Sequence, residues 1–329
     1  MNGFSLRLCA IAFFGLSATH AQDAPPSNAR DLQPRPAEMA PHASRGLLLA
    51  IARAGERLVA VGDRGVILIS GDGHQWQQVA SPVHATLTAV SFADAQHGWA
   101  VGHDAAILHT ADGGATWALQ QFKPGDNKPL LNVLALDAQH AYATGAYGLF
   151  LATADGGATW SPVDAPAMLE DGLHLNTLIR LGNGELFLAG ETGLLGVSKD
   201  GTDWKRLTLP YEGSLFGALP RGDKGALVFG LRGNVYASND VRGNRWTRID
   251  TQTVQSMFGG ALLPSGDAAL VGADGEILLI SPAGAVKRGR GAGDERSLGS
   301  GTLSGVLPID GELLVVGEAG VSTVKPGSN

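Results

Sequence analysis

Short apolar runs separated by polar turns recur along the chain from Arg45 onward. In each unit one apolar run ends in glycine, two variable residues follow, and a second apolar run leads to a turn rich in Asp and Gly and then to tryptophan. Because the runs are short, apolar or β-branched and bounded by glycine, they predict β-strands at residues 58–61, 66–70, 99–101, 107–110, 186–189 and 313–316. Long helical periodicity is absent, so the pattern predicts an all-β protein.

Two markers keep the same period. Intervals of 40 to 45 residues separate the first glycines of successive units, which are Gly62, Gly102, Gly145, Gly190, Gly230, Gly272 and Gly317. Intervals of 41 to 44 residues separate the tryptophans, which are Trp76, Trp117, Trp160, Trp204 and Trp246. Such a period with several short strands is typical of propeller blades. We therefore predict a seven-bladed β-propeller of four-stranded antiparallel blades over residues 45–329.

The last unit is shorter than the others. Residues 321–324 read as its third strand, and a fourth has no room before Asn329. Because an open ring would expose sheet edges, we expect part of residues 29–37 to add the outer strand of this blade and close the ring. The prolines of that segment favour an edge position, where missing N–H donors matter least.

The N-terminus reads as an export signal. Arg7 precedes an apolar run at residues 8–17, and small residues lead to a predicted cut after Ala21, so residues 1–21 are expected to be removed. The run is about half the length of a membrane-spanning helix. Residues 22–44 are rich in proline and read as a tether. We expect a periplasmic or secreted protein that does not span the membrane.

Composition excludes several kinds of chemistry. The only cysteine, Cys9, lies in the signal, so the mature chain has no disulfide, cysteine nucleophile or thiolate metal site. Loss of Arg7 changes the net charge from −7 to −8, which argues against general nucleic-acid binding. The basic run at residues 287–296 is either a solvated loop or a contact for anionic lipid or nucleic acid. The nine histidines show no recurring metal spacing, and we predict neither metal nor cofactor.

The most specific motif is the octapeptide Thr-Ala-Asp-Gly-Gly-Ala-Thr-Trp, which occurs at residues 110–117 and 153–160. In a hairpin, Asp accepts backbone N–H groups, Gly adopts positive φ, and Trp covers the next strand. This is the Asp-box (BNR) motif of bacterial neuraminidase-type repeats. We assign it a structural role through Asp72, Asp112, Asp155 and Asp200 with the five tryptophans named above; the alternative is catalysis or calcium binding by the aspartates.

Sialidases share this motif, so a carbohydrate-active, sialidase-like glycoside hydrolase is the alternative function. Such enzymes require a tyrosine nucleophile, carboxylates and an arginine cluster. The sequence displays no such convergent set, and its only tyrosines are Tyr142, Tyr147, Tyr211 and Tyr236. A third possibility is small-molecule binding in a central channel.

The chain more closely resembles the photosystem II stability/assembly factor-like propellers, including their proteobacterial branch. The likeness extends from about Arg45 to Val324 and is carried by residues 58–62, 98–102, 145–150, 174–176 and 210–217. The resemblance implies a non-enzymatic exported scaffold or assembly factor, expected to be a monomer. Its implied partners are proteins, either membrane-protein complexes or an export system, and not nucleic acid.

The turns that follow the marker glycines are candidates for partner binding. Propellers usually present ligands to the loops between second and third strands and between blades. Aromatic and arginine side chains are typical interface anchors. The docking hypothesis therefore selects Arg64, His103, Tyr147, Glu191, Tyr211, Glu212, Arg232 and Asp274. The alternative is that these turns are polar only because water reaches them.

Overall fold

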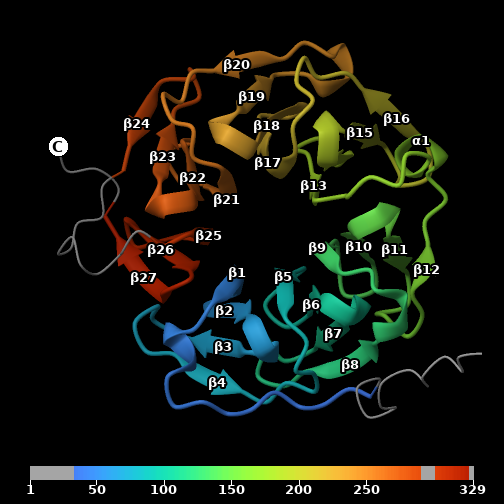
Figure 1. The fold of residues 1–329 in the computed structure, drawn as a ribbon, viewed down its shortest axis with the longest axis vertical. Coiled ribbons are helices and arrows are strands. Elements are labelled where there is room, and N and C mark those ends of the chain that lie inside the picture. The colour runs from blue at the N-terminus through green and yellow to red at the C-terminus, as the bar shows by residue number, and fades with distance from the viewer. Residues whose placement is uncertain (1–32, 290–300, 326–329) are drawn as a thin grey trace, which may run out of the picture. The chain divides into compact units, whose positions relative to one another are not determined.

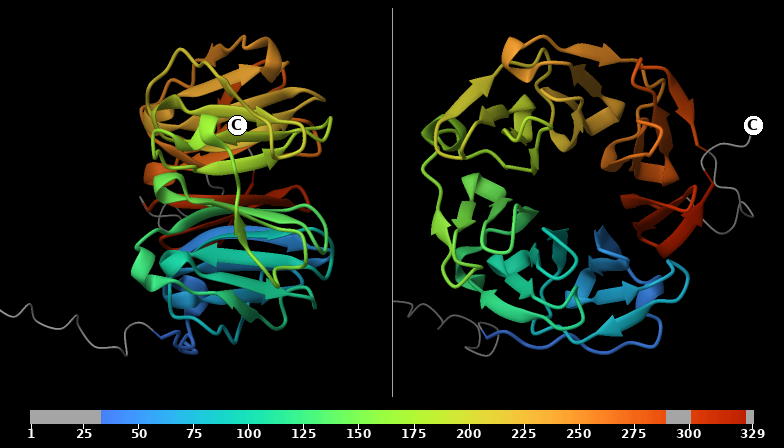
Figure 2. Two further views of the ribbon diagram at one scale, coloured as in Figure 1. Left: turned by 90° about the vertical axis from the view of Figure 1, so that its right-hand side faces the viewer. Right: turned by 180° about the vertical axis from the view of Figure 1, so that it is seen from behind.

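Seven antiparallel sheets stand around a central axis, and each is made of strands consecutive in the sequence (Figure 1). The computed structural model describes residues 33–289 and 301–325. The chain divides at Pro34, and the propeller lies in the unit from Pro34 onward. Its strands run from one face of the ring to the other (Figure 2). The predicted seven-bladed all-β fold is confirmed.

The first three blades have four strands each. Blade 1 contains β1 (Leu48–Ala54), β2 (Arg57–Gly62), β3 (Ile67–Ser70) and β4 (Gln77–Val79). Blade 2 contains β5 (Leu87–Phe92), β6 (Gly98–Gly102), β7 (Ile107–Thr110) and β8 (Ala118–Gln121). Blade 3 contains β9 (Leu130–Ala135), β10 (Ala141–Gly145), β11 (Phe150–Thr153) and the two-residue β12 (Ser161–Pro162).

The next three blades repeat this arrangement, and the seventh is shorter. Blade 4 contains β13 (Thr177–Arg180), β14 (Leu186–Ala189), β15 (Leu195–Ser198) and β16 (Trp204–Leu207). Blade 5 contains β17 (Leu215–Arg221), β18 (Gly225–Gly230), β19 (Val235–Ser238) and β20 (Thr247–Ile249). Blade 6 contains β21 (Met257–Leu262), β22 (Ala268–Gly272), β23 (Ile277–Ile280) and β24 (Val286–Arg288). Blade 7 contains β25 (Leu303–Ile309), β26 (Glu312–Gly317) and β27 (Gly320–Val324).

Helical elements are short. One α-helical turn, α1 (Pro166–Leu169), follows blade 3. Six 3₁₀ turns join second to third strands: η2 (Asp63–Gly65), η3 (His103–Ala105), η5 (Ala146–Gly148), η6 (Glu191–Gly193), η7 (Leu231–Gly233) and η9 (Ala273–Gly275). The remaining 3₁₀ turns are η1 (Ala43–Arg45), η4 (Pro124–Asp126) and η8 (Val241–Gly243).

The marker glycines are explained by a close approach of two backbones. Each ends a second strand in extended conformation, so positive φ is not what requires glycine there. A Cβ on Gly272 would run into the carbonyl oxygen of Ser256, and one on Gly62 would meet that of Leu47. The same holds at every other marker position, because a backbone carbonyl from before the first strand lies against the glycine. The repeat period therefore records a steric requirement of each blade.

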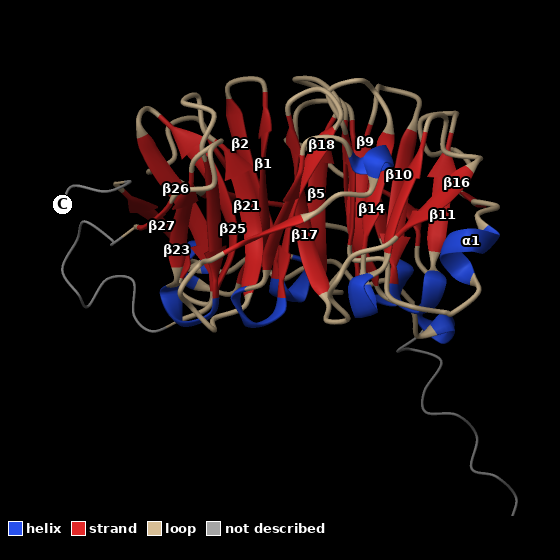
Figure 3. Cartoon of the chain, turned by 90° about the horizontal axis from the view of Figure 1, so that it is seen from above, coloured by secondary structure: helices blue, strands red, loops and turns tan. Residues whose placement is uncertain are grey.

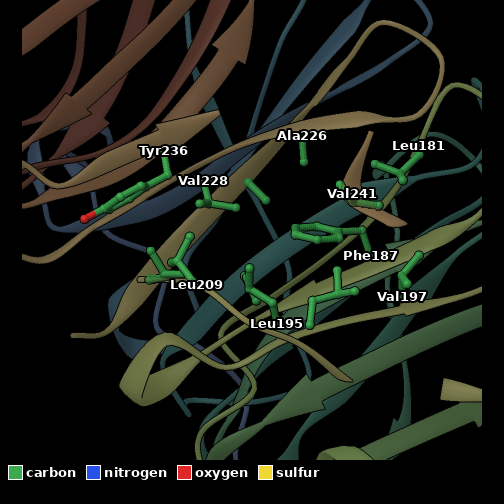
Figure 4. Close-up of a cluster of buried hydrophobic side chains, with 13 residues drawn as sticks. Leu181, Phe187, Leu195, Val197, Leu209, Ala226, Val228, Tyr236 and Val241 are labelled. Atoms are coloured by element: carbon green, nitrogen blue, oxygen red, sulfur yellow. The ribbon is translucent and has the colours of Figure 1, made fainter. Parts of the chain in front are cut away.

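The core lies between the blades. Second strands such as β6 and β18 are buried along their whole length, since a neighbouring blade covers each face. Seven clusters of buried apolar side chains correspond to the seven contacts between adjacent blades. In the cluster between blades 4 and 5, Phe187 and Leu195 face Val228 and Tyr236 (Figure 4). Burial of these faces by the neighbouring blade drives formation of the ring.

The contact between blades 7 and 1, called here the seam, closes the ring without a shared sheet. Val316 and Val321 of blade 7 pack in one cluster with Leu48, Ala60 and Leu68 of blade 1. The Ser304 hydroxyl donates to the Leu48 carbonyl oxygen across the seam (2.7 Å). With five buried residues against thirteen between blades 4 and 5, the seam has the smallest such cluster among the described residues.

The expected closing strand is not shown: the described part of that segment, residues 33–37, adds no strand to blade 7. Residues 34–40 form no strand and lie along β4 of blade 1: Ala37 N–H donates to Ser81 O (3.0 Å), and Gln78 binds Ala40 and Glu38 through its side chain. Blade 7 keeps three strands, with η1 beside β27. Residues 29–32 lie outside the described part of the chain.

Several other expectations also fall outside the described residues. These are the signal at residues 1–21, the cut after Ala21, most of the tether at 22–44, and the basic residues from Arg290 to Arg296. The part of the basic run that is described belongs to β24, where Arg288 pairs with Glu276 (3.4 Å). Within residues 33–289 and 301–325 no helix is long and apolar enough to cross a membrane.

Candidate functional site

The six turns η2, η3, η5, η6, η7 and η9 lie on one face of the ring, and we call it the turn face (Figure 3). In each of them the central residue has left-handed φ, between 51° and 59°: Arg64, Asp104, Tyr147, Thr192, Arg232 and Asp274. Such a conformation is costly for residues other than glycine, by about 1–2 kcal/mol. The sequence had suggested two-residue inserts; the structure shows three-residue turns with one strained central position.

The predicted docking residues all lie on this face, though spread over six blades. Arg64, Tyr147, Arg232 and Asp274 occupy central turn positions and are exposed. His103 and Glu191 occupy first positions, with His103 exposed and Glu191 half-buried. Arg64 and His103, on blades 1 and 2, are separate from the cluster described next.

Blades 3 and 4 bring Tyr147, His174 and Glu191 together. The Tyr147 ring is 57% exposed and meets His174 edge to face, with ring centroids 4.9 Å apart. Glu191 Oε2 accepts the backbone N–H of His174 (3.1 Å), which holds the loop carrying the imidazole. An exposed aromatic side chain fixed by a second ring matches the anchors that dominate protein interfaces.

Tyr211 differs from its expected role. Its ring lies 5.8 Å from that of Tyr236, its hydroxyl donates to Leu231 O (3.1 Å), and burial raises its pKa. Its ring therefore packs into the junction of blades 4 and 5, and only its neighbour Glu212 is exposed. Tyr211 therefore positions the loop between blades 4 and 5 and does not present a free aromatic surface to a partner.

Two exposed apolar side chains near η7 were missed by the sequence analysis. Leu231 is 37% exposed and Val254 is 78% exposed. The loop carrying Val254 is held against η7, since Arg232 N–H donates to Ser256 Oγ (3.2 Å), and Asp274 accepts from Gln255 Nε2 (2.6 Å). Single apolar residues in polar turns carry no periodic signal, so only the fold reveals that they adjoin Arg232 and Asp274.

The Asp-boxes lie at the opposite face, in the turns between third and fourth strands. Asp155 Oδ1 accepts Thr159 N–H (2.9 Å) and Oδ2 accepts the Thr159 hydroxyl (2.7 Å). The backbone N–H of Thr159, followed by the hydroxyls of Thr159 and Thr153, lowers the pKa of Asp155 to about 2. The backbone N–H of Thr202 is the largest cause that lowers the pKa of Asp200 to about 2. Asp72 likewise accepts two backbone N–H groups. This geometry supports the turn-closing interpretation of the aspartates.

The box tryptophans follow three patterns. Trp76, Trp117 and Trp204 donate their indole N–H to the carbonyl of a glycine in their own box, at 2.9–3.0 Å. Trp160 instead donates to Gln120 Oε1 of blade 2 (3.0 Å). Trp246 packs against Phe187, and its buried Nε1 has no partner in the described part of the chain.

The central channel is lined by the first strands of all seven blades around a cavity of about 270 Å³. Its described walls are apolar or neutral, and the rings of Phe216 and Phe258 lie tilted to one another with centroids 5.3 Å apart. The hydroxyl and amide groups there bind the backbone of neighbouring blades, as Thr88 does with Leu130 O (2.8 Å) and Asn176 with Leu215 O (2.8 Å). No carboxylate, guanidinium, ammonium or imidazole group is among the described lining residues. No cluster of three metal-ligating side chains occurs in the described ranges either.

Comparison with known proteins identifies the family. The family model described as photosynthesis system II assembly factor YCF48 matches residues 68–164 and 126–287, which together span more than half of the chain. The chain belongs to this Ycf48 family. The resemblance drawn from the repeat motifs is thereby confirmed.

Relatives show how far the likeness reaches. The chain is 32% identical to the photosystem II assembly protein Ycf48 of Thermosynechococcus vestitus over 213 residues, 64% of this chain and 60% of that protein. A solved structure of YCF48 bound to a D1 peptide superposes with a TM-score of 0.68 at 18% identity, covering 89% of this chain and 97% of that one. Virginiamycin B lyase from Staphylococcus aureus superposes with a TM-score of 0.72 at 9% identity, covering 89% and 98%. Because a lyase shares the architecture, the fold alone does not decide function.

Proposed function

We propose that this chain is a non-enzymatic, exported assembly factor or scaffold whose turn face binds a segment of a protein partner. The observation that carries the proposal is the turn face itself, where Tyr147, Leu231 and Val254 are exposed beside charged side chains. Membership of the Ycf48 family supports an assembly role. A structure of YCF48 with a D1 peptide supports a polypeptide ligand for the family's fold.

The partner proposed is a protein of a membrane complex or export system, and the scaffold is proposed to act as a monomer. The apolar run before Ala21 supports export into the compartment where such complexes expose their soluble segments. The neutral channel supports a non-enzymatic role, because glycoside hydrolysis needs paired carboxylates at the substrate. Turnover of a panel of chromogenic glycosides by the purified protein would contradict this part of the proposal.

Affinity capture from the envelope fraction tests the turn face. We expect a partner captured by the wild-type chain to be lost when Arg64, Tyr147 and Arg232 are together replaced by Ala. The matched control replaces Lys205 and Arg248, exposed cations of the outer strands β16 and β20, together with Met39, an exposed apolar side chain of the segment along β4, and should retain the partner. Equal capture by both triple variants would refute docking at the turn face. A folded-state check by circular dichroism ensures that both variants keep the propeller.

A further inference from the structure

A cavity lies between blades 3 and 4, at the face that carries the Asp-boxes. Its volume is about 630 Å³. The walls come from the β9–β10 and β11–β12 turns of blade 3, the β13–β14 and β15–β16 turns of blade 4, and the strand ends beside them. The cavity is therefore remote from the turn face and independent of the proposed docking function.

Blade 3 departs from the repeat beside this cavity, at its outer strand. The strand β12 has two residues, against three or four in the other outer strands, and its Ser161 lines the cavity. Trp160 donates to Gln120 of blade 2 and not to a glycine of its own box, but it packs toward the preceding blade as the other box tryptophans do. The short outer strand is therefore the departure that borders the cavity. In a repeat protein, a local departure of this kind is where a function is expected.

Hydrogen-bonding groups of both kinds remain unused at the cavity wall. Arg180 and Lys199 are exposed, and neither has a hydrogen bond or carboxylate partner among the described residues. Asp200 accepts all its described bonds through Oδ1, which leaves Oδ2 available. His140 is held through Nδ1 by Asp137 (2.9 Å), which leaves Nε2 directed away from that carboxylate. Hydrogen-bond donors and acceptors without described partners therefore line the same cavity.

The charges at the cavity nearly balance. Asp137 has a lowered pKa, chiefly through the backbone N–H of Gln139, and Asp155 and Asp200 have pKa values of about 2, so all three are ionised at neutral pH. Arg180 and Lys199 oppose them. A strongly anionic ligand would meet three carboxylates and a cationic one would meet two cations, so neither is favoured. Between the polar groups lie apolar wall residues, Leu136 and Leu186 among them.

We propose that this cavity binds a saccharide. Sugar hydroxyl groups both donate and accept hydrogen bonds, as the mixed wall requires, and the C–H faces of a pyranose ring suit the apolar wall segments. The ligand is uncharged, which agrees with the balanced charges. Arg180 and Lys199 donate to hydroxyl oxygens, and Asp200 Oδ2 accepts a hydroxyl proton. Of the three carboxylates only Asp200 keeps an oxygen without a partner among the described residues, since Asp137 and Asp155 accept bonds through both of theirs. The pair of carboxylates that glycoside hydrolysis needs is therefore not available, and the proposed site binds without turnover.

Saturation-transfer NMR and calorimetry with maltotriose and N,N′-diacetylchitobiose test the proposal on the full-length mature chain. We expect at least one of the two to bind. The double variant Arg180→Ala/Lys199→Ala should lower that affinity by about tenfold or more, because two charge-assisted hydrogen bonds are lost. The control variant Lys205→Ala/Arg248→Ala removes the same charge from exposed outer strands and should bind like the wild type.

Three results would overturn the proposal: no saturation transfer to either saccharide, equal affinity of the Arg180/Lys199 variant, or binding of inorganic phosphate without saccharide binding. The last would assign the cavity to anions instead. Both substituted residues are exposed and lack described structural contacts, so folding is not at risk. The test leaves the turn face untouched, and its failure would not bear on partner docking.

Discussion

The seam between blades 7 and 1 allows a direct test of how the ring is held. Leu48 and Val316 are fully buried in the same cluster but belong to the first and last blades. We expect Leu48→Ala to cost about 3 kcal/mol and Val316→Ala about 2 kcal/mol, from lost burial and residual cavity. Because the two side chains share one cluster, the double variant should show a coupling energy of about 0.5 kcal/mol or more.

The expected change in melting temperature follows from the size of the unit. Unfolding entropy of about 2.1 cal/mol/K per residue over roughly 290 residues gives about 0.6 kcal/mol/K. A loss of 3 kcal/mol therefore lowers Tm by about 5 °C. Thermal scans give the shift, and urea titrations at 25 °C give the free energies for the double-mutant cycle.

A matched control uses Leu215, which pairs with the marker glycine of blade 5 as Leu48 does in blade 1. The double variant Leu48→Ala/Leu215→Ala should be additive within about 0.5 kcal/mol, because the two sites are not in one cluster. Additivity of Leu48→Ala with Val316→Ala, or a cost of Leu48→Ala below about 0.5 kcal/mol, would refute a ring closed by packing at the seam.

Three further predictions follow from the repeat and the chain ends. Gly272→Ala should destabilise the protein by about 1–3 kcal/mol, measured by urea unfolding, because the added Cβ meets the Ser256 carbonyl. Gly71→Ala is the control and should be near neutral, because the space around Gly71 is open. Equal effects of the two substitutions would contradict the steric explanation of the marker glycines. Asp155 and Asp200 have folded pKa values of about 2, below the ordinary 3.8. Their contribution to stability is therefore present above about pH 4 and lost as the pH falls toward 2. Asp155→Asn should reduce the fall of Tm between pH 4 and pH 2, and an unchanged fall would contradict this prediction. The mature protein should begin at Gln22, which intact-mass measurement of the exported chain checks; retention of residues 1–21 would contradict the export signal.

The sequence predicted correctly those features whose structural reason lies within a single blade. The marker glycines and box tryptophans repeat because every blade needs the same backbone approach and the same turn closure, so counting them predicts seven sheets. The closing strand is not shown in the described residues, and its place depends on which blade the N-terminal segment accompanies, which is a non-local fact. The prolines before residue 38 indicated an edge position, but nothing in them specifies which blade they accompany.

The same division holds for the candidate sites. The turn positions could be placed on one face from the period alone, and Arg64, Tyr147 and Arg232 do lie there. The packing of Tyr211 against Tyr236 and the exposure of Val254 depend on which loops adjoin, and sequence spacing does not reveal this. The blade 3–4 cavity was also beyond reach, because its walls come from turns of two blades whose separation the sequence does not reveal.

No described sheet combines strands from the two ends of the chain, so the contact between the first and last blades is of the same kind as every other contact between blades. A circular permutant that joins the ends of the propeller and opens any loop between blades would keep every sheet whole and exchange one packed contact for another. The same modular logic makes a whole blade the natural unit of duplication, and blades 2 and 3 carry the identical Asp-box octapeptide.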